Sequence, residues 1–210
     1  MIRLDPFCPI VPDTAWLARL VSQGVRLIQL RIKDADAACI AVQIAEAVEL
    51  CRAQNCQLVI NDYWREAIAA GANFVHLGQD DLAQADLAAI KRAGLRLGIS
   101  THSPEELTTA LRALPDYVAL GPIYATKLKP MPWAPQGLAP LAEWRSQIDG
   151  PLVAIGGVTL ERAAEVFAAG ADSIAVITDI VTNPDPEART REWLAATAYR
   201  RSLSTGFPQS

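Results

Sequence analysis

Eight short apolar segments recur along the 210-residue chain, and stretches of helical periodicity separate them. The apolar segments are rich in Val, Ile and Leu, whereas the stretches between them place apolar residues three and four positions apart. Near-continuous apolar strands that alternate with helices are typical of a parallel sheet buried on both faces. The expected strands are residues 7–11, 26–32, 57–61, 74–78, 96–100, 117–123, 151–157 and 173–178.

Eight strand–helix units in a chain of this length predict a single-domain α/β protein, a (β/α)8 TIM barrel. We expect the catalytic barrel domain to span residues 1–201 and residues 202–210 to form a flexible C-terminal tail. The net charge of −4 gives no indication of nucleic-acid binding. No apolar run is long enough to span a membrane, and we expect a cytoplasmic protein without membrane contacts.

Unusual polar residues gather at the carboxyl ends of the expected strands, where TIM barrels carry their functional groups. Gln29, Arg31 and Lys33 occupy alternate positions at the end of the second strand, so they face the same side of the sheet. Further groups follow later strands: Asn61 and Asp62, then Gln79, Asp80 and Asp81, then Ser100, Thr101 and His102, then Lys127 and Lys129.

Carboxylates and cations around one barrel mouth predict a site for a diphosphate. Two aspartates can supply the few protein oxygens that Mg²⁺ takes, and water and substrate phosphate supply the remainder. Lysine and arginine side chains form charge-assisted hydrogen bonds with phosphate oxygens. Gly156 and Gly157, at the end of the seventh strand, predict a second anion site, because glycine lets backbone N–H groups approach a ligand closely.

Several of these residues also have purely structural interpretations. Arg31 or Lys33, taken alone, would more often form a surface ion pair, and Asp81 has the alternative of capping the next helix. We predict that Asp13 and Ser103 are helix N-caps and that His76 is a hydrogen-bonded polar residue at a strand end.

Taken in order, these motifs resemble those of the thiamine-phosphate synthase (thiamine-phosphate pyrophosphorylase) family. The resemblance extends from about residue 8 to residue 200. It implies a transferase that couples 4-amino-2-methyl-5-hydroxymethylpyrimidine diphosphate with thiazole phosphate, releasing diphosphate and forming thiamine phosphate by a Mg²⁺-assisted dissociative mechanism. The motifs that carry it are QLRIK (29–33), IND (60–62), HLGQDD (76–81), GISTH (98–102), LGPIYATKLK (120–129) and AIGGV (154–158).

The resemblance also assigns roles to particular residues. It implies that Asp62 and Asp81 bind Mg²⁺ and that Arg31, Lys33, Ser100 and Lys129 act directly in catalysis. It implies substrate contacts at Gln29, Leu30, Arg31, Ile32, Lys33, Asn61, Ser100, Thr126, Lys127, Leu128, Lys129, Gly157, Ile177 and Thr178. A homodimer is a further expectation from the resemblance.

Two positions depart from the family pattern. Leu128 stands where the family usually has threonine immediately before the lysine, and Asp179 stands near the end of strand eight, where Ser-Ala is common. An inward-pointing Asp179 would repel a phosphate, so we predict that it points toward the following helix.

Three alternative functions remain open from the sequence. The first is a thiazole tautomerase in which His102 transfers protons. The second is a different phosphate-binding barrel enzyme, and the third is a non-catalytic protein that binds thiamine precursors. The aspartate pair favours the synthase, because proton transfer by a tautomerase has no need of it.

Overall fold

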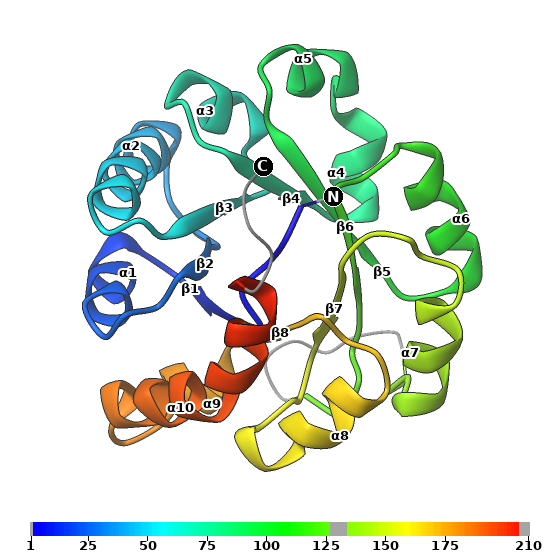
Figure 1. Cartoon of the computed structure of the whole chain (residues 1–210). Helices are drawn as coiled ribbons and strands as arrows, with labels where there is room; N and C mark the ends of the chain where they lie inside the picture. The colour runs from blue at the N-terminus through cyan, green and yellow to red at the C-terminus, as the bar shows by residue number, and fades with distance from the viewer. Residues whose placement is uncertain (1, 127–133, 206–210) are drawn as a thin grey trace.

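The computed structural model describes residues 2–126 and 134–205. Within these ranges eight parallel strands pair in sequence order, and β8 closes the ring against β1 (Figure 1). The predicted single-domain (β/α)8 barrel is therefore confirmed. The strands are β1 (Phe7–Val11), β2 (Leu27–Leu30), β3 (Gln57–Asn61), β4 (Phe74–Leu77), β5 (Arg96–Thr101), β6 (Tyr117–Leu120), β7 (Leu152–Ile155) and β8 (Ser173–Val176).

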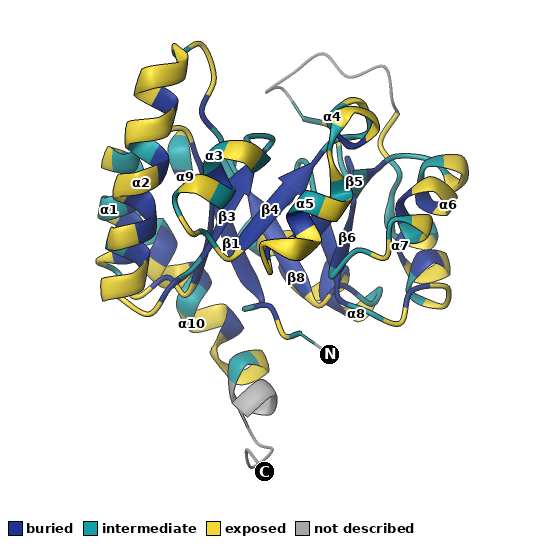
Figure 2. Cartoon of the chain, turned by 90° about the horizontal axis from the view of Figure 1, so that it is seen from above, coloured by how far each residue is buried: buried dark blue, intermediate teal, exposed yellow. Residues whose placement is uncertain are grey.

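Helices form the outer ring and turn their exposed faces away from the strands (Figure 2). Among the described residues, no helix combines the length and the apolar character needed to cross a membrane. The helices are α1 (Thr14–Val21), α2 (Ala37–Ala53), α3 (Trp64–Ala69), α4 (Gln79–Gln84), α5 (Leu87–Arg92), α6 (Pro104–Arg112), α7 (Leu138–Arg145), η1 (Leu160–Arg162), α8 (Ala163–Ala168), α9 (Thr178–Val181) and α10 (Pro186–Thr205).

The sheet separates two hydrophobic cores. The larger core lies between strands and helices and includes Leu30, Ile60 and Trp193. The smaller core fills the inside of the barrel and includes Val59 and Tyr117. Because side chains alternate across a strand, both faces of each strand are buried, which explains the near-continuous apolar runs in the sequence.

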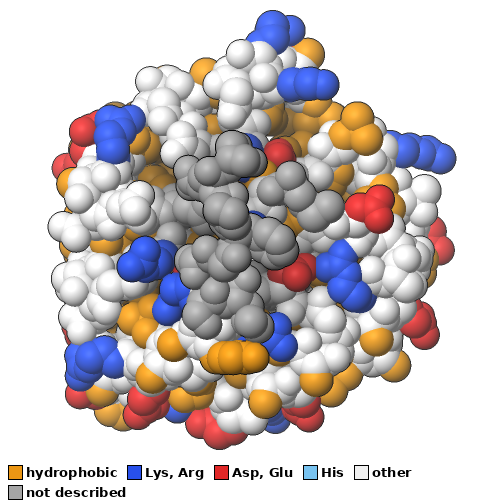
Figure 3. Space-filling model, in the orientation of Figure 1, with side chains coloured by type: hydrophobic (Ala, Val, Ile, Leu, Met, Phe, Trp, Pro, Cys, Tyr) orange, Lys and Arg blue, Asp and Glu red, His pale blue; other side chains and the backbone are white. Residues whose placement is uncertain are grey.

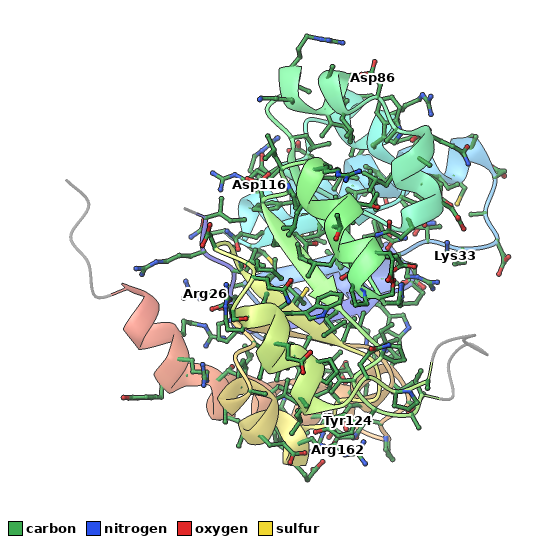
Figure 4. All side chains as sticks on the ribbon, turned by 90° about the vertical axis from the view of Figure 1, so that its right-hand side faces the viewer. Arg26, Lys33, Asp86, Asp116, Tyr124 and Arg162 are labelled. Carbon is green, nitrogen blue, oxygen red and sulfur yellow. The ribbon has the colours of Figure 1, made fainter. Side chains whose placement is uncertain are left out.

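The inside of the barrel becomes polar toward the carboxyl ends of the strands. Gln29, Asn61 and His76 are each buried, with 6 to 7% of their surface exposed. Figure 4 shows Arg26 and Lys33, which flank β2, at opposite ends of the barrel. Figure 3 shows the opposite end of the molecule, on the side of the two chain termini, where Lys and Arg side chains lie among Asp and Glu around the rim.

Local signals in the sequence correspond to real helix ends. The side chain of Asp13 accepts a hydrogen bond from the N–H of Trp16 (2.8 Å), and Ser103 accepts one from the N–H of Glu106 (3.3 Å). Both predicted N-caps are confirmed.

Lys127, Leu128 and Lys129 lie outside the described residues, as does the end of the chain from residue 206. The boundary at residue 201 stays a prediction.

Candidate active site

A cavity of about 560 Å³ opens at the carboxyl ends of the strands. Its walls come from loops that follow several different strands, as expected for an active site in this fold. The predicted residues that line it are Gln29, Arg31, Lys33, Asn61, Asp62, Asp81, Ser100, Thr126, Gly157, Ile177 and Thr178.

Two of the predicted contact residues do not turn toward this cavity. Leu30 and Ile32 are 1% and 2% exposed, and their side chains pack in the outer core against the helices. They alternate with Gln29, Arg31 and Lys33 along an extended segment, so the two sets must face opposite sides. The side chains that form one wall of the cavity are therefore the three polar ones.

Asp62 has an unusual backbone conformation at the end of β3. Its φ is +67°, which is uncommon for any residue except glycine. The N–H of Tyr63 donates to the carbonyl of Asn61 (2.9 Å), closing a three-residue turn around Asp62, and the Asp62 N–H donates to the carbonyl of His76 (2.9 Å). Strained positions of this kind cluster at functional sites. The fold thus holds Asp62 firmly at the cavity.

Asp62, Asp81 and Lys33 form a compact charged group. The Nζ atom of Lys33 lies 3.1 Å from Oδ2 of Asp62. Burial raises the pKa of Asp81, and the charge of Asp62 and a hydrogen bond between the two carboxyl groups raise it further, against a lowering by Lys33. Asp81 does not cap a helix, since the N-cap of α4 is Gly78. When both groups are ionised, the two carboxylates repel each other, and a cation between them would relieve this repulsion.

This pair suits a metal that needs few protein ligands. In the described part of the chain, no three His, Cys, Asp or Glu side chains come together as a metal-binding group. Such a group is what a zinc site requires. Mg²⁺, in contrast, is commonly held by one or two carboxylates together with waters and substrate phosphates. The donor set of Asp62 and Asp81 therefore fits Mg²⁺.

Gly156 and Gly157 bring the loop after β7 against the loop after β6. A Cβ atom on Gly156 would lie 2.7 Å from Cα of Pro122, and one on Gly157 would lie 2.5 Å from the carbonyl oxygen of Ala125. Both glycines also have positive φ, at +94° and +65°. Larger residues would separate the loops, so glycine is required here for packing as well as for access to the cavity.

The outer edge of this loop is fixed by side chains from η1 and α8. Arg162 donates to the carbonyl of Gly157 (2.8 Å) and lies over the ring of Tyr124, 4.3 Å from its centre (Figure 4). The Tyr124 hydroxyl donates to Glu165 (2.5 Å). These contacts tie the end of β7 to the segment that leads toward Thr126.

Asp179 points away from the cavity, which confirms its predicted orientation. Its two carboxylate oxygens each accept a hydrogen bond of 2.9 Å from Arg189 on α10, and Oδ2 also accepts one from Nε1 of Trp193 (2.7 Å). The side chain of Asp179 is 10% exposed. The charge of Asp179 is thus neutralised within the helical layer and does not oppose an anion near Thr178.

We expect Arg189→Ala to lower the free energy of unfolding by about 3 kcal/mol, because it leaves the buried Asp179 carboxylate without its cation. Urea unfolding without ligands measures this. Arg19→Ala is the matched control, since Arg19 pairs with Glu187 at the surface and its loss should change stability little. Equal effects of the two changes would contradict the structural role of Arg189.

Comparison with known proteins gives the family. The family model described as "Thiamine monophosphate synthase" matches residues 9–180, most of the chain. The chain belongs to this family. It is therefore an enzyme, a transferase of thiamine biosynthesis that acts on small molecules.

Individual members of the thiamine monophosphate synthase family match closely. The chain is 61% identical to the thiamine-phosphate synthase of Rhizobium etli over 203 residues, which cover 96% of this chain and 100% of the relative. It is 50% identical to that of Salmonella paratyphi B, with 89% of each chain covered. Thiamine phosphate pyrophosphorylase from Pyrococcus furiosus superposes with a TM-score of 0.81 at 26% identity, covering 92% of this chain and 95% of that one.

Two groups near the cavity of this member of the thiamine monophosphate synthase family were not predicted from its sequence. Glu106 accepts hydrogen bonds from both the N–H and Nδ1 of His102, at 2.7 and 2.8 Å, and both residues line the cavity. Their spacing of four residues is a signal that could have predicted the contact. The other group is Tyr117, which is 41 residues from its partner His76 and has no comparable signal.

Proposed function

We propose that the chain couples 4-amino-2-methyl-5-hydroxymethylpyrimidine diphosphate with thiazole phosphate to form thiamine phosphate and diphosphate. The observation that carries this proposal is the group of Asp62, Asp81 and Lys33 at one side of a single cavity. Gly157 and Thr178 line the same cavity from the loops after β7 and β8, which are the usual phosphate-binding loops of this fold. One cavity can thus hold a diphosphate and a second phosphate together.

In this proposal the diphosphate lies over the ends of β2 and β3. Arg31 and Lys33 form charge-assisted hydrogen bonds with its oxygens, and Lys129, outside the described residues, is assigned the same role. Asp62 and Asp81 would hold Mg²⁺, which supplies Lewis-acid stabilisation of the negative charge on the departing diphosphate. Gln29 and Asn61, which hydrogen-bond each other at 3.4 Å, offer amide groups to the pyrimidine ring below.

The chemistry then requires a site that stabilises charge and excludes water. Cleavage of the C–O bond to diphosphate leaves a cation that the electron-rich aminopyrimidine stabilises, and the thiazole nitrogen captures it. The pair of electrons in the broken bond leaves with diphosphate, and the new C–N bond forms from the nitrogen lone pair. The protein contributes orientation and exclusion of water, since water would otherwise capture the cation.

The pair of His102 and Glu106 supports a second candidate, the thiazole tautomerase. A histidine hydrogen-bonded to a carboxylate in a cavity is suited to proton transfer. The two candidates differ in what they need. The synthase requires the aspartates and should retain most of its activity in His102→Ala, whereas a tautomerase requires His102 and should be insensitive to loss of the aspartates.

The deciding experiment is formation of thiamine phosphate from the two purified substrates, with Mg²⁺ and with EDTA, in the wild type and in His102→Ala. We expect product in both proteins and only with Mg²⁺. Isomerisation of a thiazole carboxylate phosphate without coupling would identify the tautomerase. Substrate binding without any turnover would identify the non-catalytic alternative. The homodimer and the cytoplasmic location stay predictions.

We expect Lys129→Ala to reduce coupling more than Lys127→Ala, because Lys129 is the position that matches the family motif. The loss of one charge-assisted hydrogen bond to the diphosphate predicts about a 10-fold or larger decrease in kcat for Lys129→Ala. Steady-state kinetics with saturating Mg²⁺ measure both variants. The reverse ranking would show that the alignment across Leu128 is displaced.

A further inference from the structure

We propose that Tyr117 and His76 form a hydrogen-bonded relay that fixes the direction of the Ser100 hydroxyl, so that Ser100 donates its hydrogen to the bound substrate. Tyr117 and His76 are positioning residues in this proposal, and Ser100 is the group that touches the ligand. The inference rests on the proposed function for the identity of that ligand, the pyrimidine diphosphate. The relay itself can be tested without any substrate.

The three side chains form a continuous chain from the core of the barrel to the cavity. The hydroxyl of Tyr117 on β6 lies 2.9 Å from Nδ1 of His76 on β4, and Nε2 of His76 lies 2.6 Å from Oγ of Ser100 on β5. The rings of Tyr117 and His76 also stack, with their centres 5.6 Å apart at 22°. His76 and Ser100 line the cavity, whereas Tyr117 lies beneath it in the interior core.

The surroundings of Tyr117 set the direction of each hydrogen bond. Among the described residues, His76 is the hydrogen-bond partner found for the Tyr117 hydroxyl. The interior core around the ring is otherwise apolar except for the thiol of Cys8, and Gln29 lines the same small internal cavity. A phenol hydrogen without an acceptor would be costly in such a place, so Tyr117 donates to Nδ1 of His76. A neutral imidazole carries one N–H, so the hydrogen must then be on Nε2.

The tautomer of His76 decides which role the Ser100 hydroxyl takes in their hydrogen bond. Because Nε2 of His76 is the donor, Oγ of Ser100 is the acceptor in their hydrogen bond, and the hydroxyl hydrogen of Ser100 is left for another partner. In the described structure the remaining open direction is the cavity. A substrate acceptor, such as an oxygen of the departing diphosphate, would receive that hydrogen. The opposite tautomer of His76 would take up the Ser100 hydrogen and present lone pairs to the same anion.

The position of Tyr117 is itself fixed by a glycine. A Cβ atom on Gly98 of β5 would lie 2.0 Å from Cζ of Tyr117 and 2.4 Å from its hydroxyl oxygen. The ring therefore occupies the space that a side chain at residue 98 would need. This close contact between neighbouring strands holds the hydroxyl beneath His76 without contributing anything to the cavity wall.

The first test is the tautomer of His76, measured by long-range ¹H–¹⁵N NMR on the full chain with labelled histidine. The sequence contains two histidines, so His102→Ala assigns the spectrum directly. We expect His76 to carry its hydrogen on Nε2, with Nδ1 as an acceptor. In Tyr117→Phe, the Nδ1 resonance should move toward that of a ring nitrogen without a hydrogen bond. A hydrogen on Nδ1 in the wild type would overturn the proposal.

The second test is a double-mutant cycle in the coupling reaction. Tyr117→Phe removes one buried oxygen and should lower kcat about 10-fold with little change in KM. This is the size expected when the hydrogen bond from Ser100 to the charged diphosphate is lost. In the Ser100→Ala background the same change should have no further effect on kcat, because the hydroxyl that the relay orients is then absent. Tyr199→Phe, at an exposed position on α10, is the control.

The outcomes separate this inference from the proposed function. Multiplicative losses in Tyr117→Phe and Ser100→Ala, or full activity of Tyr117→Phe, would overturn the relay while leaving the synthase intact. An inactive wild type would overturn the proposed function, and the NMR measurement would still decide the relay. The same NMR measurement on the wild type also decides it if Tyr117→Phe does not fold.

Discussion

Asp62→Asn and Asp81→Asn should each reduce the rate of thiamine phosphate formation by about 100-fold or more. Each change keeps the volume of the side chain and removes one negative charge from the proposed Mg²⁺ site. Stabilisation of a departing diphosphate by a bound metal contributes several kcal/mol to the transition state, and 1.36 kcal/mol corresponds to a factor of ten. The Mg²⁺ concentration for half-maximal rate should also rise in both variants.

Stability should change in the opposite direction from activity. Without Mg²⁺, loss of either charge relieves the repulsion that helps to raise the pKa of Asp81, so thermal stability should stay level or increase. The measurements are coupling rate against Mg²⁺ concentration and thermal unfolding in EDTA. Asp86→Asn is the control, since Asp86 caps α5 at the surface and asparagine caps equally well. If coupling rate depends on Mg²⁺ concentration in both variants as it does in the wild type, the proposed Mg²⁺-assisted mechanism is wrong.

Gly98→Ala is expected to cost about 3 kcal/mol of unfolding free energy, the size expected when a methyl group is forced into a filled core. The added carbon would lie 2.0 Å from the ring of Tyr117, which is rigid and enclosed within the barrel. Either the ring or the backbone of β5 must move, and both are confined by neighbouring strands. Urea unfolding monitored by circular dichroism measures the loss.

A double-mutant cycle tests the cause of this loss. Tyr117→Leu removes the atoms nearest the added methyl, so Gly98→Ala in that background should cost less than about 1 kcal/mol. Gly150→Ala is the control for the substitution itself, because its Cβ would meet only an ordinary contact at 3.5 Å from the carbonyl of Asp116. A full loss in the Tyr117→Leu background would show that backbone strain, and not the ring, is responsible.

The strands and the location of the cavity could be predicted because their signals are local. A strand buried on both faces needs a near-continuous apolar run, and polar residues at its end can then lie only at the barrel mouth. The orientation of Asp179 also followed from a local conflict between its charge and the anion site predicted beside it. These predictions depend on composition within a few residues and on the order of the strands.

Other features depend on contacts between distant segments. The contact between Gly98 and Tyr117 pairs two residues on neighbouring strands, and only the register of β5 against β6 brings them together. The positive φ of Asp62 arises from the turn around it and from the hydrogen bond of its backbone N–H to the carbonyl of His76. The identity of the residue as aspartate does not predict this conformation. The pattern QLRIK suggested five neighbouring contacts, but strand alternation divides those side chains between two layers.

The positive φ of Asp62 limits which residues evolution can place at this position. Asparagine and glycine enter this backbone region readily, whereas β-branched and bulky residues do not. A substitution at residue 62 must therefore meet two separate requirements: the new residue must adopt this backbone conformation for the chain to fold, and it must supply the carboxylate for catalysis. A library of variants at residue 62 would yield folded, inactive proteins mainly from Asn and Gly, while most other substitutions would reduce the yield of folded protein before catalysis could be selected.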